Sequence, residues 1–314
     1  MNLHEFKEEL GSELEHILAS DFEVSVLDTD VVPSGDDPDI TYPNLATGRL
    51  KCKLIETCVI HVDLRRSTNI SFDHRRATLA KLYSGFIRAM VRCAGQFGGK
   101  VRGIVGDRVM VIFNRDGCFG NAIDTAVLMN SVAKFLLDER FSGDDVACGI
   151  GIDYGKMLAT KVGIIKRGTE NTENKSLVWL GKPANAASKL TDAANKIQTN
   201  EIPIVREGLH YPTTGAWTWH DRDPIEFVES LEKTFSSILR HPNEYFSSFY
   251  TTSRAAFEGT PPILMTKAVY EGFKRERPDA QEVRNGWYGE HQVPLAGSTE
   301  TVYGGDVHYT IFGS

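Results

Sequence analysis

The order of apolar segments in the first half of the chain constrains its fold more than any other feature. A β-branched run at 58–64 precedes a stretch, 73–96, in which apolar residues recur every three or four positions, as on one face of a helix. Two short β-type runs fill 100–113, and only Gly106-Asp107, a pair typical of a hairpin turn, separates them. The pattern predicts a strand, a long helix and a β-hairpin, in that order.

A second helix and further strands complete the pattern. Apolar residues at helical spacing between 123 and 136 predict a second long helix. Residues 146–155 and 157–163 predict two more strands. The order strand, helix, strand, strand, helix, strand is that of the split βαβ or ferredoxin-like arrangement, so the sequence predicts an α+β fold.

The flanking segments predict additions to this core. Residues 2–20 carry apolar residues at helical spacing and lead into a polar arm with Pro and Gly. Residues 221–258 and about 265–282 are aromatic-rich and helical in pattern, and the final stretch returns to strand character. We predict four parts: an N-terminal helix and arm at 1–50, a core at 51–214, a helical insertion at 215–286, and C-terminal strands at 287–314 that complete the core.

Composition excludes several classes of protein. The chain has 314 residues, of which 41% are hydrophobic and 25% charged, as in a globular protein with a substantial core. Lys and Arg number 35 against 42 Asp and Glu, so the net charge is −7. This balance argues against a nucleic-acid binder that depends on a basic face, and we expect no nucleic-acid partner.

Cysteine usage and hydropathy favour an intracellular protein. The five cysteines are odd in number and include no Cys-x-x-Cys pair, which disfavours a zinc site or a secreted disulfide framework and predicts reduced, buried thiols. No run approaches the roughly 18 uninterrupted apolar residues of a membrane span, and the acidic N-terminus is unlike a signal peptide. We expect a soluble, cytoplasmic protein with no membrane partner.

Two aspartates are expected at one edge of the predicted sheet. In a split βαβ fold, the hairpin of the second and third strands places its tip at the carboxyl end of the first strand. Asp63 ends that first strand, and Asp107 lies in the hairpin turn. Two converging carboxylates repel unless a cation lies between them, and hard oxygen ligands suit Mg²⁺ or Mn²⁺. Either aspartate alone could be a helix cap or a turn residue, but the matched positions favour a metal site.

The segment after Asp63 favours phosphate binding. Arg65, Arg66, Ser67 and Thr68 lead into a predicted helix. Backbone N–H groups, hydroxyls and guanidinium groups at such a position suit a triphosphate. The alternative is an ordinary helix cap flanked by surface arginines.

Three motifs, in order, resemble those of the class III nucleotide cyclases. Residues 63–68 (DLRRST) match their turn after the first strand, and residues 106–107 (GD) match their hairpin. Residues 180–189 (LGKPANAASK) match their Gly turn and Asn-x-Ala-Ser-Arg helix. The resemblance covers 57–195 and resumes at 287–313.

The resemblance implies cyclisation of a nucleoside triphosphate to a 3′,5′-cyclic monophosphate, with release of pyrophosphate. Asp63 and Asp107, with the backbone carbonyl of Leu64, would hold two Mn²⁺ or Mg²⁺ ions per active site. Asn185 and Lys189, one helical turn apart, would act on the ribose and the phosphates. Family members work as head-to-tail dimers, so a homodimer with sites shared across its interface is implied as well.

Departures from the family pattern concern catalysis and base recognition. Lys189 replaces the arginine that stabilises the pentavalent phosphorus, a point charge in place of a bidentate fork. The base-reading positions hold Gly103, with Arg102 beside it, and Val178, where an adenine amino group would lack its acceptor. Trp179 next to it either stacks on the base or belongs to the core. The candidates to compensate for Lys189 are Arg65, Arg66, Arg108 and Lys182.

One branch of the family fits these departures. The chain resembles the pyrimidine cyclases of bacterial antiphage Pycsar systems, which share the turn at 63–68, the helix with Lys189 and a Gly-Gly-Asp-Val strand, 304–307 in this chain. Arg102 is rich in hydrogen-bond donors and suits the carbonyl-rich face of uracil more than the amino edge of cytosine, which favours UTP over CTP. In this branch the cyclic nucleotide activates a separate effector protein.

Other functions stay open on the sequence alone. A cytidylate cyclase or a purine (adenylate or guanylate) cyclase would use the same metal aspartates. Polymerases and dinucleotide cyclases use similar ones, although the Gly-Gly-Glu-Glu/Asp-Phe hairpin of the latter is missing. The non-enzymatic alternative is a degenerate cyclase domain that only binds a nucleotide. Asp63 and Asp107 are both present, which favours the enzyme.

Overall fold

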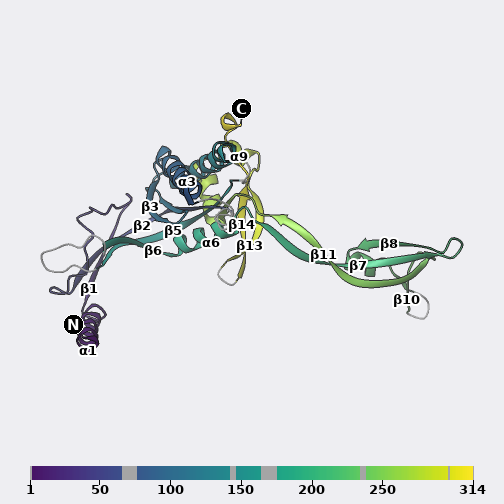
Figure 1. Ribbon diagram of the computed structural model, residues 1–314, viewed down its shortest axis with the longest axis horizontal. Helices are drawn as coiled ribbons and strands as arrows, with labels where there is room; N and C mark the ends of the chain where they lie inside the picture. Colours follow the sequence, from purple (N-terminus) through teal and green to yellow (C-terminus); the bar gives the residue numbers. More distant parts are fainter. Residues whose placement is uncertain are drawn as a thin grey trace. The chain divides into compact units, whose positions relative to one another are not determined.

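The predicted succession of strands and helices in the first half of the chain is present in the structure, a computed structural model (Figure 1). The elements are β2 (Arg49–Leu64), α3 (Arg76–Gln96), β3 (Lys100–Val105), β4 (Arg108–Ile112), α4 (Cys118–Ser131) and β5 (Cys148–Gly163). The strands lie in the order β5-β2-β4-β3, and β2 is antiparallel to both β5 and β4. This is the ferredoxin-like arrangement, so the predicted α+β fold is confirmed.

Further strands extend this sheet. The structure describes residues 2–65, 76–141, 146–163, 175–233, 238–295 and 298–313, and within them the sheet has nine strands. The C-terminal strands lie in it, because β14 pairs with β12 and β12 pairs with β5. The added strands are β1 (Glu23–Asp28), β6 (Lys175–Leu180), β12 (Ile263–Thr266), β13 (Gly289–Leu295) and β14 (Ser298–Gly305).

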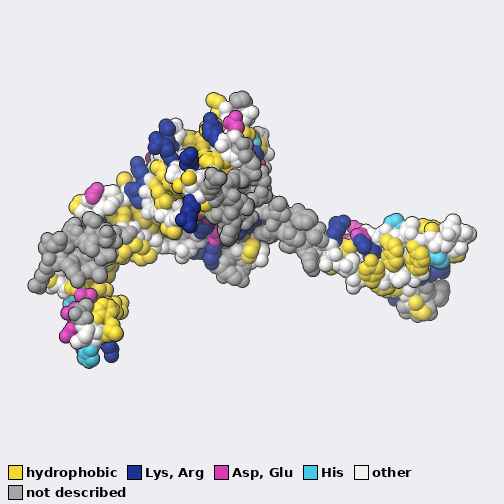
Figure 2. Space-filling model, in the orientation of Figure 1, with side chains coloured by type: hydrophobic (Ala, Val, Ile, Leu, Met, Phe, Trp, Pro, Cys, Tyr) yellow, Lys and Arg dark blue, Asp and Glu magenta, His cyan; other side chains and the backbone are white. Residues whose placement is uncertain are grey.

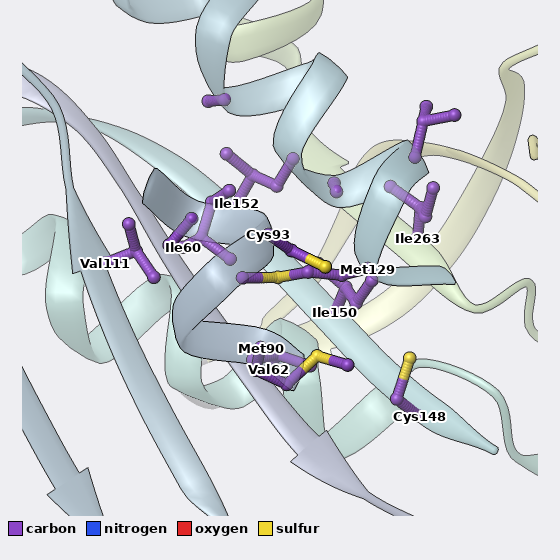
Figure 3. Close-up of a cluster of buried hydrophobic side chains, with 14 of the residues drawn as sticks. Ile60, Val62, Met90, Cys93, Val111, Met129, Cys148, Ile150, Ile152 and Ile263 are labelled. Carbon is purple, nitrogen blue, oxygen red and sulfur yellow. The ribbon is translucent and has the colours of Figure 1, made fainter. Parts of the chain in front are cut away.

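Alternation along β2 gives the sheet two apolar faces. Val62 is fully buried on one face, where it packs in a cluster that includes Met90 of α3 (Figure 3). Val59 belongs to a second cluster, which includes Ala187 of helix α6 (Lys182–Ala193). Burying an aliphatic side chain of this size stabilises a fold by about 1.5–3 kcal/mol. Helices therefore cover both faces, with α3 and α4 on one and α6 on the other.

One predicted pair of strands is a single strand. β5 runs without interruption over 148–163. The sequence pattern predicted two strands here, one at 146–155 and another at 157–163. Gly155 pairs with Thr57 of β2, so the antiparallel ladder continues through the glycine. A glycine inside a strand pattern does not by itself end the strand when the neighbouring strand continues alongside it.

The region 215–286 differs from the predicted helical insertion. β8 (Ala216–Arg222) and β11 (Phe246–Gly259) are strands, and both pair with β7 (Ile197–Tyr211). Both strands carry aromatic residues and threonines, which are enriched in strands. The prediction of helices followed the spacing of aromatic residues over a long window, which does not separate helix from strand here. The helices in this region are α7 (Pro224–Glu229), α8 (Lys267–Glu276) and α9 (Gln281–Arg284), and a short ribbon is formed by β9 (Glu232–Lys233) and β10 (Leu239–Arg240).

Residues 197–259 form a compact unit of their own, and the rest of the chain forms the other. Figure 2 shows hydrophobic side chains gathered on the surface of this smaller unit. The exposed hydrophobic residues of this unit include Trp217 and Trp219, whose rings stack with centroids 5.7 Å apart, and Tyr250, whose ring centroid lies 5.6 Å from that of Trp219. The unit thus presents an exposed aromatic face on one side of β8 and β11.

Helix α1 (Leu3–Ile17) begins with a capping box, in which the side chain of Asn2 accepts from the backbone of Glu5 and the Glu5 carboxylate accepts from the backbone of Asn2. None of its residues is buried, and its apolar stripe is exposed. In the described part of the chain, no helix is both long enough and apolar enough to span a membrane. All five cysteines are buried and unbridged, as predicted.

Residues of the larger unit hydrogen-bond to one another at the point where the smaller unit is inserted. The backbone N–H of Thr260 donates to the carbonyl of Lys196 at 2.8 Å, and the N–H of Lys196 donates to Oγ1 of Thr260 at 3.0 Å. The N–H of Asn195 donates to the carbonyl of Pro261 at 3.0 Å. The two ends of the insertion are therefore held side by side by residues that do not belong to it.

Deletion of 197–259, with Lys196 and Thr260 joined through a linker of about four Gly and Ser residues, should leave the larger unit folded. The ends already share hydrogen bonds, so the short loop closes at little entropic cost. We expect one cooperative thermal transition by circular dichroism, within about 5 °C of the larger unit's transition in the full chain. Deletion of 263–266, a fully paired strand, is the control that should abolish the transition. Aggregation of the first variant would contradict the expectation.

Candidate active site

The register between β2 and β4 brings the two predicted metal aspartates to one edge of the sheet. Val62 pairs with Val109 in the antiparallel ladder. Asp63, the next residue of β2, therefore lies beside Arg108, the first residue of β4. Asp107 precedes Arg108 directly, so both carboxylates belong to the same corner of the sheet.

The hairpin that carries Asp107 has a two-residue turn. Val105 pairs with Arg108 across it. Gly106 has a φ of +62°, a backbone conformation that glycine adopts without a steric penalty. The turn is short, which fixes Asp107 relative to β4. Asp107 is partly buried at this position.

Arg108 connects Asp63 to helix α6. Its Nη2 donates to Oδ2 of Asp63 at 2.6 Å and to Oδ1 of Asp192 at 2.5 Å, and its Nη1 donates to Oγ of Ser188 at 2.7 Å. The side chains of Asp63 and Arg108 are 16% and 26% exposed, so solvent screens their attraction only in part. Burial lowers the pKa of Arg108, but the hydrogen bonds to Asp63 and Asp192 outweigh it and raise the pKa overall. Arg108 is therefore a permanent cation between two carboxylates.

Arg65 adds unused donors at the same edge. Its side chain lies against Gly149 of β5, where a Cβ atom would stand 1.7 Å from the Nη2 of Arg65. The Nε and Nη2 atoms are buried and have no hydrogen-bond partner among the described residues. Burial also lowers the pKa of Arg65. A guanidinium with free donors suits a phosphate oxygen. The other predicted phosphate-binding residues, Arg66, Ser67 and Thr68, lie outside the described residues.

The donor set at this edge fits a hard cation. Within the described ranges, no group of three or more His, Cys, Asp and Glu side chains is placed to hold a metal ion. Mg²⁺ needs fewer, because it is commonly held by one or two carboxylates together with water and substrate phosphates. Asp63 already binds a cationic group, the guanidinium of Arg108, at 2.6 Å. Asp63 and Asp107, with the carbonyl of Leu64, are thus suited to Mg²⁺ or Mn²⁺.

A cavity of about 520 Å³ adjoins helix α6. Asn185 and Lys189 line it from the helix, and β5, β12, α8 and β14 form the remaining walls. Neither Asp63 nor Asp107 is among the described residues that line it. The size is typical of a small-ligand site. Four lysines face two carboxylates, which favours an anionic ligand: the charged lining residues are Asp153, Lys156, Lys182, Lys189, Lys267 and Glu300.

Glycine at position 151 lets α6 lie directly on the sheet. A Cβ atom there would stand 2.2 Å from the carbonyl oxygen of Ala187 and 2.4 Å from the backbone nitrogen of Thr191. The hydroxyl of Thr191 donates to the carbonyl of His61 on β2 at 2.9 Å. The backbone of α6 is therefore fixed against β5 and β2, and the polar side chains of the helix are fixed with it.

The predicted base-reading residues lie away from this cavity. Arg102 on β3 donates from Nε to the carbonyl of Pro33 and from Nη1 to that of Val101, both at 3.0 Å. Val178 lies on β6. Trp179 is 8% exposed and packs in the core cluster that α6 covers, which matches the core interpretation of this residue. None of the three lines the 520 Å³ cavity among its described residues.

Sequence reasoning missed Asp153. This residue of β5 is 6% exposed, lines the cavity and accepts a hydrogen bond of 2.6 Å from the hydroxyl of Thr266. Burial raises its pKa above the usual carboxyl value. The available signal was a carboxylate that directly follows the apolar run 148–152, because a charged residue inside a strand of this kind requires a compensating environment.

Asp153→Asn should reduce the dependence of stability on pH. The pKa of Asp153 is higher in the native state, so the wild type loses stability as the pH rises from the ordinary carboxyl range through that raised value. An uncharged asparagine avoids this loss and still accepts from Thr266. We expect the variant to exceed the wild type in melting temperature at about pH 7 but not at about pH 3.

Thermal unfolding across that pH range measures the effect. Asp116→Asn, at an exposed aspartate, is the matched control and should follow the wild type throughout. If the curves of Asp153→Asn and the wild type stay parallel, Asp153 does not titrate differently on folding.

Comparison with known proteins adds sequence relatives. No protein-family model matches the chain. The chain is 28% identical over 221 residues to a protein of Gulbenkiania mobilis, and the match covers 65% of this chain and 82% of that protein. It is 29% identical over 143 residues to a protein of Burkholderia cepacia, covering 44% of this chain and 59% of that protein. This chain therefore spans little more than half the length of the second relative.

The comparison confirms the resemblance to the class III nucleotide cyclases. Both relatives are named uridylate cyclase. Among solved structures, the chain is similar to the adenylyl cyclase CyaB of P. aeruginosa, with 16% identity and a TM-score of 0.47 over 81% of this chain and 94% of that one.

Proposed function

We propose that this chain is a uridylate cyclase, which converts UTP to 3′,5′-cyclic UMP and pyrophosphate. The observation that carries the proposal is the placement of Asp63 and Asp107 at one corner of the sheet, beside the unused donors of Arg65. The relationship to two proteins named uridylate cyclase supports the choice of reaction and base.

The reaction forms a bond from the ribose 3′-oxygen to the α-phosphorus and breaks the bond from that phosphorus to the β-phosphate oxygen. Asp63, Asp107 and the carbonyl of Leu64 would hold two Mg²⁺ or Mn²⁺ ions. Such ions, when bound, lower the pKa of the 3′-hydroxyl and neutralise charge on the triphosphate. The 3′-hydroxyl would give its proton to solvent water, and pyrophosphate would leave with the electron pair of the broken bond.

The chain's own polar residues have complementary roles in this proposal. Arg65 donates to phosphate oxygens through its free Nε and Nη2 atoms. Lys189 places a positive charge where negative charge develops on the phosphorus oxygens, and Asn185 hydrogen-bonds the ribose and orients its 3′-oxygen. The lysine-lined cavity around them favours the anionic substrate.

We propose further that the working enzyme is a head-to-tail homodimer with shared sites. Asn185 and Lys189 line a cavity whose described lining excludes Asp63 and Asp107 of the same chain. Within one chain, the Asp63–Asp107 corner therefore lies outside the described lining of this cavity, although Arg108 joins the corner to α6. In a two-fold pair, the aspartates of one copy can face the α6 helix of the other.

Base choice and biological role extend the same proposal. Arg102 on β3, which lies outside the described lining of the cavity at Asn185 and Lys189, would donate to a carbonyl oxygen of uracil. The product would be a cytoplasmic second messenger that activates a separate effector in antiphage defence.

Incubation of the purified chain with ATP, GTP, CTP or UTP, each with Mn²⁺, tests the reaction. We expect cyclic UMP and pyrophosphate from UTP by mass spectrometry, at a rate at least about tenfold above that with CTP, because a mismatched polar edge leaves buried donors unpaired. Cyclic CMP as the main product would make the chain a cytidylate cyclase. No cyclic product from any triphosphate would overturn the enzyme proposal.

Variants test which residues form the active site and whether two chains share each site. Asp63→Asn and Lys189→Ala should each lower the rate by at least about 100-fold, whereas Asp116→Asn, the control at an exposed aspartate, should not. Mixed Asp63→Asn and Lys189→Ala chains should regain activity, because a mixed dimer contains one intact site. Absence of regain, with mixed dimers demonstrated by native mass spectrometry, would place both residues in the site of a single chain.

A further inference from the structure

Arg108 holds Asp63 in the way that a bound cation would. The Nη2 atom lies 2.6 Å from Oδ2 of Asp63, and both side chains are largely shielded from solvent. A guanidinium at this distance satisfies the carboxylate with a charge-assisted hydrogen bond. A divalent ion bound to the same oxygen would stand close to the arginine, and like charges in a partly buried corner repel. Ion and arginine therefore compete for Asp63.

The remaining partners of Arg108 lie on a different element. Ser188 and Asp192 belong to α6, the helix that also carries Asn185 and Lys189. The Nη2 atom is shared between the carboxylates of Asp63 and Asp192. If Asp63 is withdrawn, Asp192 and Ser188 still offer Arg108 two acceptors, so the arginine need not be left without partners.

We propose that Arg108 is a positioning residue that couples metal loading at Asp63 to helix α6. In the metal-free chain it neutralises Asp63 and divides its hydrogen bonds between β2 and α6. When a divalent ion binds Asp63, Arg108 transfers to Asp192 and Ser188 alone and tightens its attachment to the helix that presents Asn185 and Lys189. This inference rests on the proposed metal role of Asp63.

Affinity for Mn²⁺ without nucleotide measures the competition. Electron paramagnetic resonance of free Mn²⁺ gives the dissociation constant directly. We expect Arg108→Met, which keeps most of the side-chain length without the charge, to bind Mn²⁺ at least about tenfold more tightly, because the lost competitor is a charge-assisted hydrogen bond. Arg108→Lys keeps the cation and should stay close to the wild type. Unchanged or weaker binding by Arg108→Met would overturn the proposal.

A double variant excludes a different source of tighter binding. In Arg108→Met alone, the freed carboxylate of Asp192 could itself become a metal ligand. Arg108→Met combined with Asp192→Asn should therefore keep the tenfold gain if that gain comes from release of Asp63. Loss of the gain in the double variant would assign it to Asp192 and contradict the proposal.

Hydrogen exchange tests the coupling to α6. Mn²⁺ should slow amide exchange in residues 188–194 of the wild type, since Arg108 then bonds only to that helix. The same addition should leave these amides unchanged in Arg108→Met, and α3 should be unaffected in both proteins. A residue that merely ties the hairpin to α6 would give no metal-dependent change, so slowing that persists in Arg108→Met, or is absent from the wild type, would refute the coupling.

Asp63→Asn separates this inference from the proposed function. If Asp63→Asn binds Mn²⁺ as the wild type does, the metal assignment itself fails. If Asp63→Asn loses binding while Arg108→Met shows no gain, the metal assignment stands and the role of Arg108 is refuted. Circular dichroism of each variant, with Arg108→Lys as the conservative reference, establishes that the chains are folded.

Discussion

The antiparallel ladder between β2 and β5 is the constraint on which the rest of the structure depends. Lys53 to Leu64 pair with Cys148 to Ala159, and this register decides which side chains face each layer of helices. A slip of one residue would exchange the two faces of β2, so that Val62 would leave the cluster that contains Met90 for the opposite face of the sheet. It would also move Asp63 away from Gly149, the small residue over which Arg65 lies. Core packing and site geometry are therefore fixed by one set of hydrogen bonds.

Much of the fold was predictable because its signals are local. The strand at 58–64, the helix that follows and the Gly106-Asp107 turn each carry their own pattern, and the ferredoxin-like order follows from their succession. The unit at 197–259 was not predicted as a sheet, although a short loop at 212–215 joins β7 to β8. The other partner of β7 is β11, which begins 35 residues after β7 ends, so that pairing is set by tertiary contact. β5 was divided for the same reason, since its continuity comes from β2.

Part of the candidate site was likewise predictable from the sequence, and part of it depends on long-range contacts. Topology alone predicted that Asp63 and Asp107 share an edge, and the register agrees. The contacts of Arg108 could not be predicted, because Asp63 is 45 residues and Asp192 84 residues away in the chain. Asp153 was missed because only the packing of β12 and β14 around it turns a strand aspartate into the wall of a cavity. Long-range packing, not residue type, carries this information.

The paired backbone at Lys196 and Thr260 has an evolutionary consequence. Since the larger unit completes its own hydrogen bonds there, natural selection can act on the exposed aromatic sheet of Trp217 and Trp219 with little effect on the fold around Asp63 and Asp107. The segment 197–259, between Lys196 and Thr260, can diverge, lengthen or be exchanged between lineages while the larger unit keeps its fold. Divergence of the inserted unit and retention of the Asp63–Asp107 corner can thus coexist in one polypeptide.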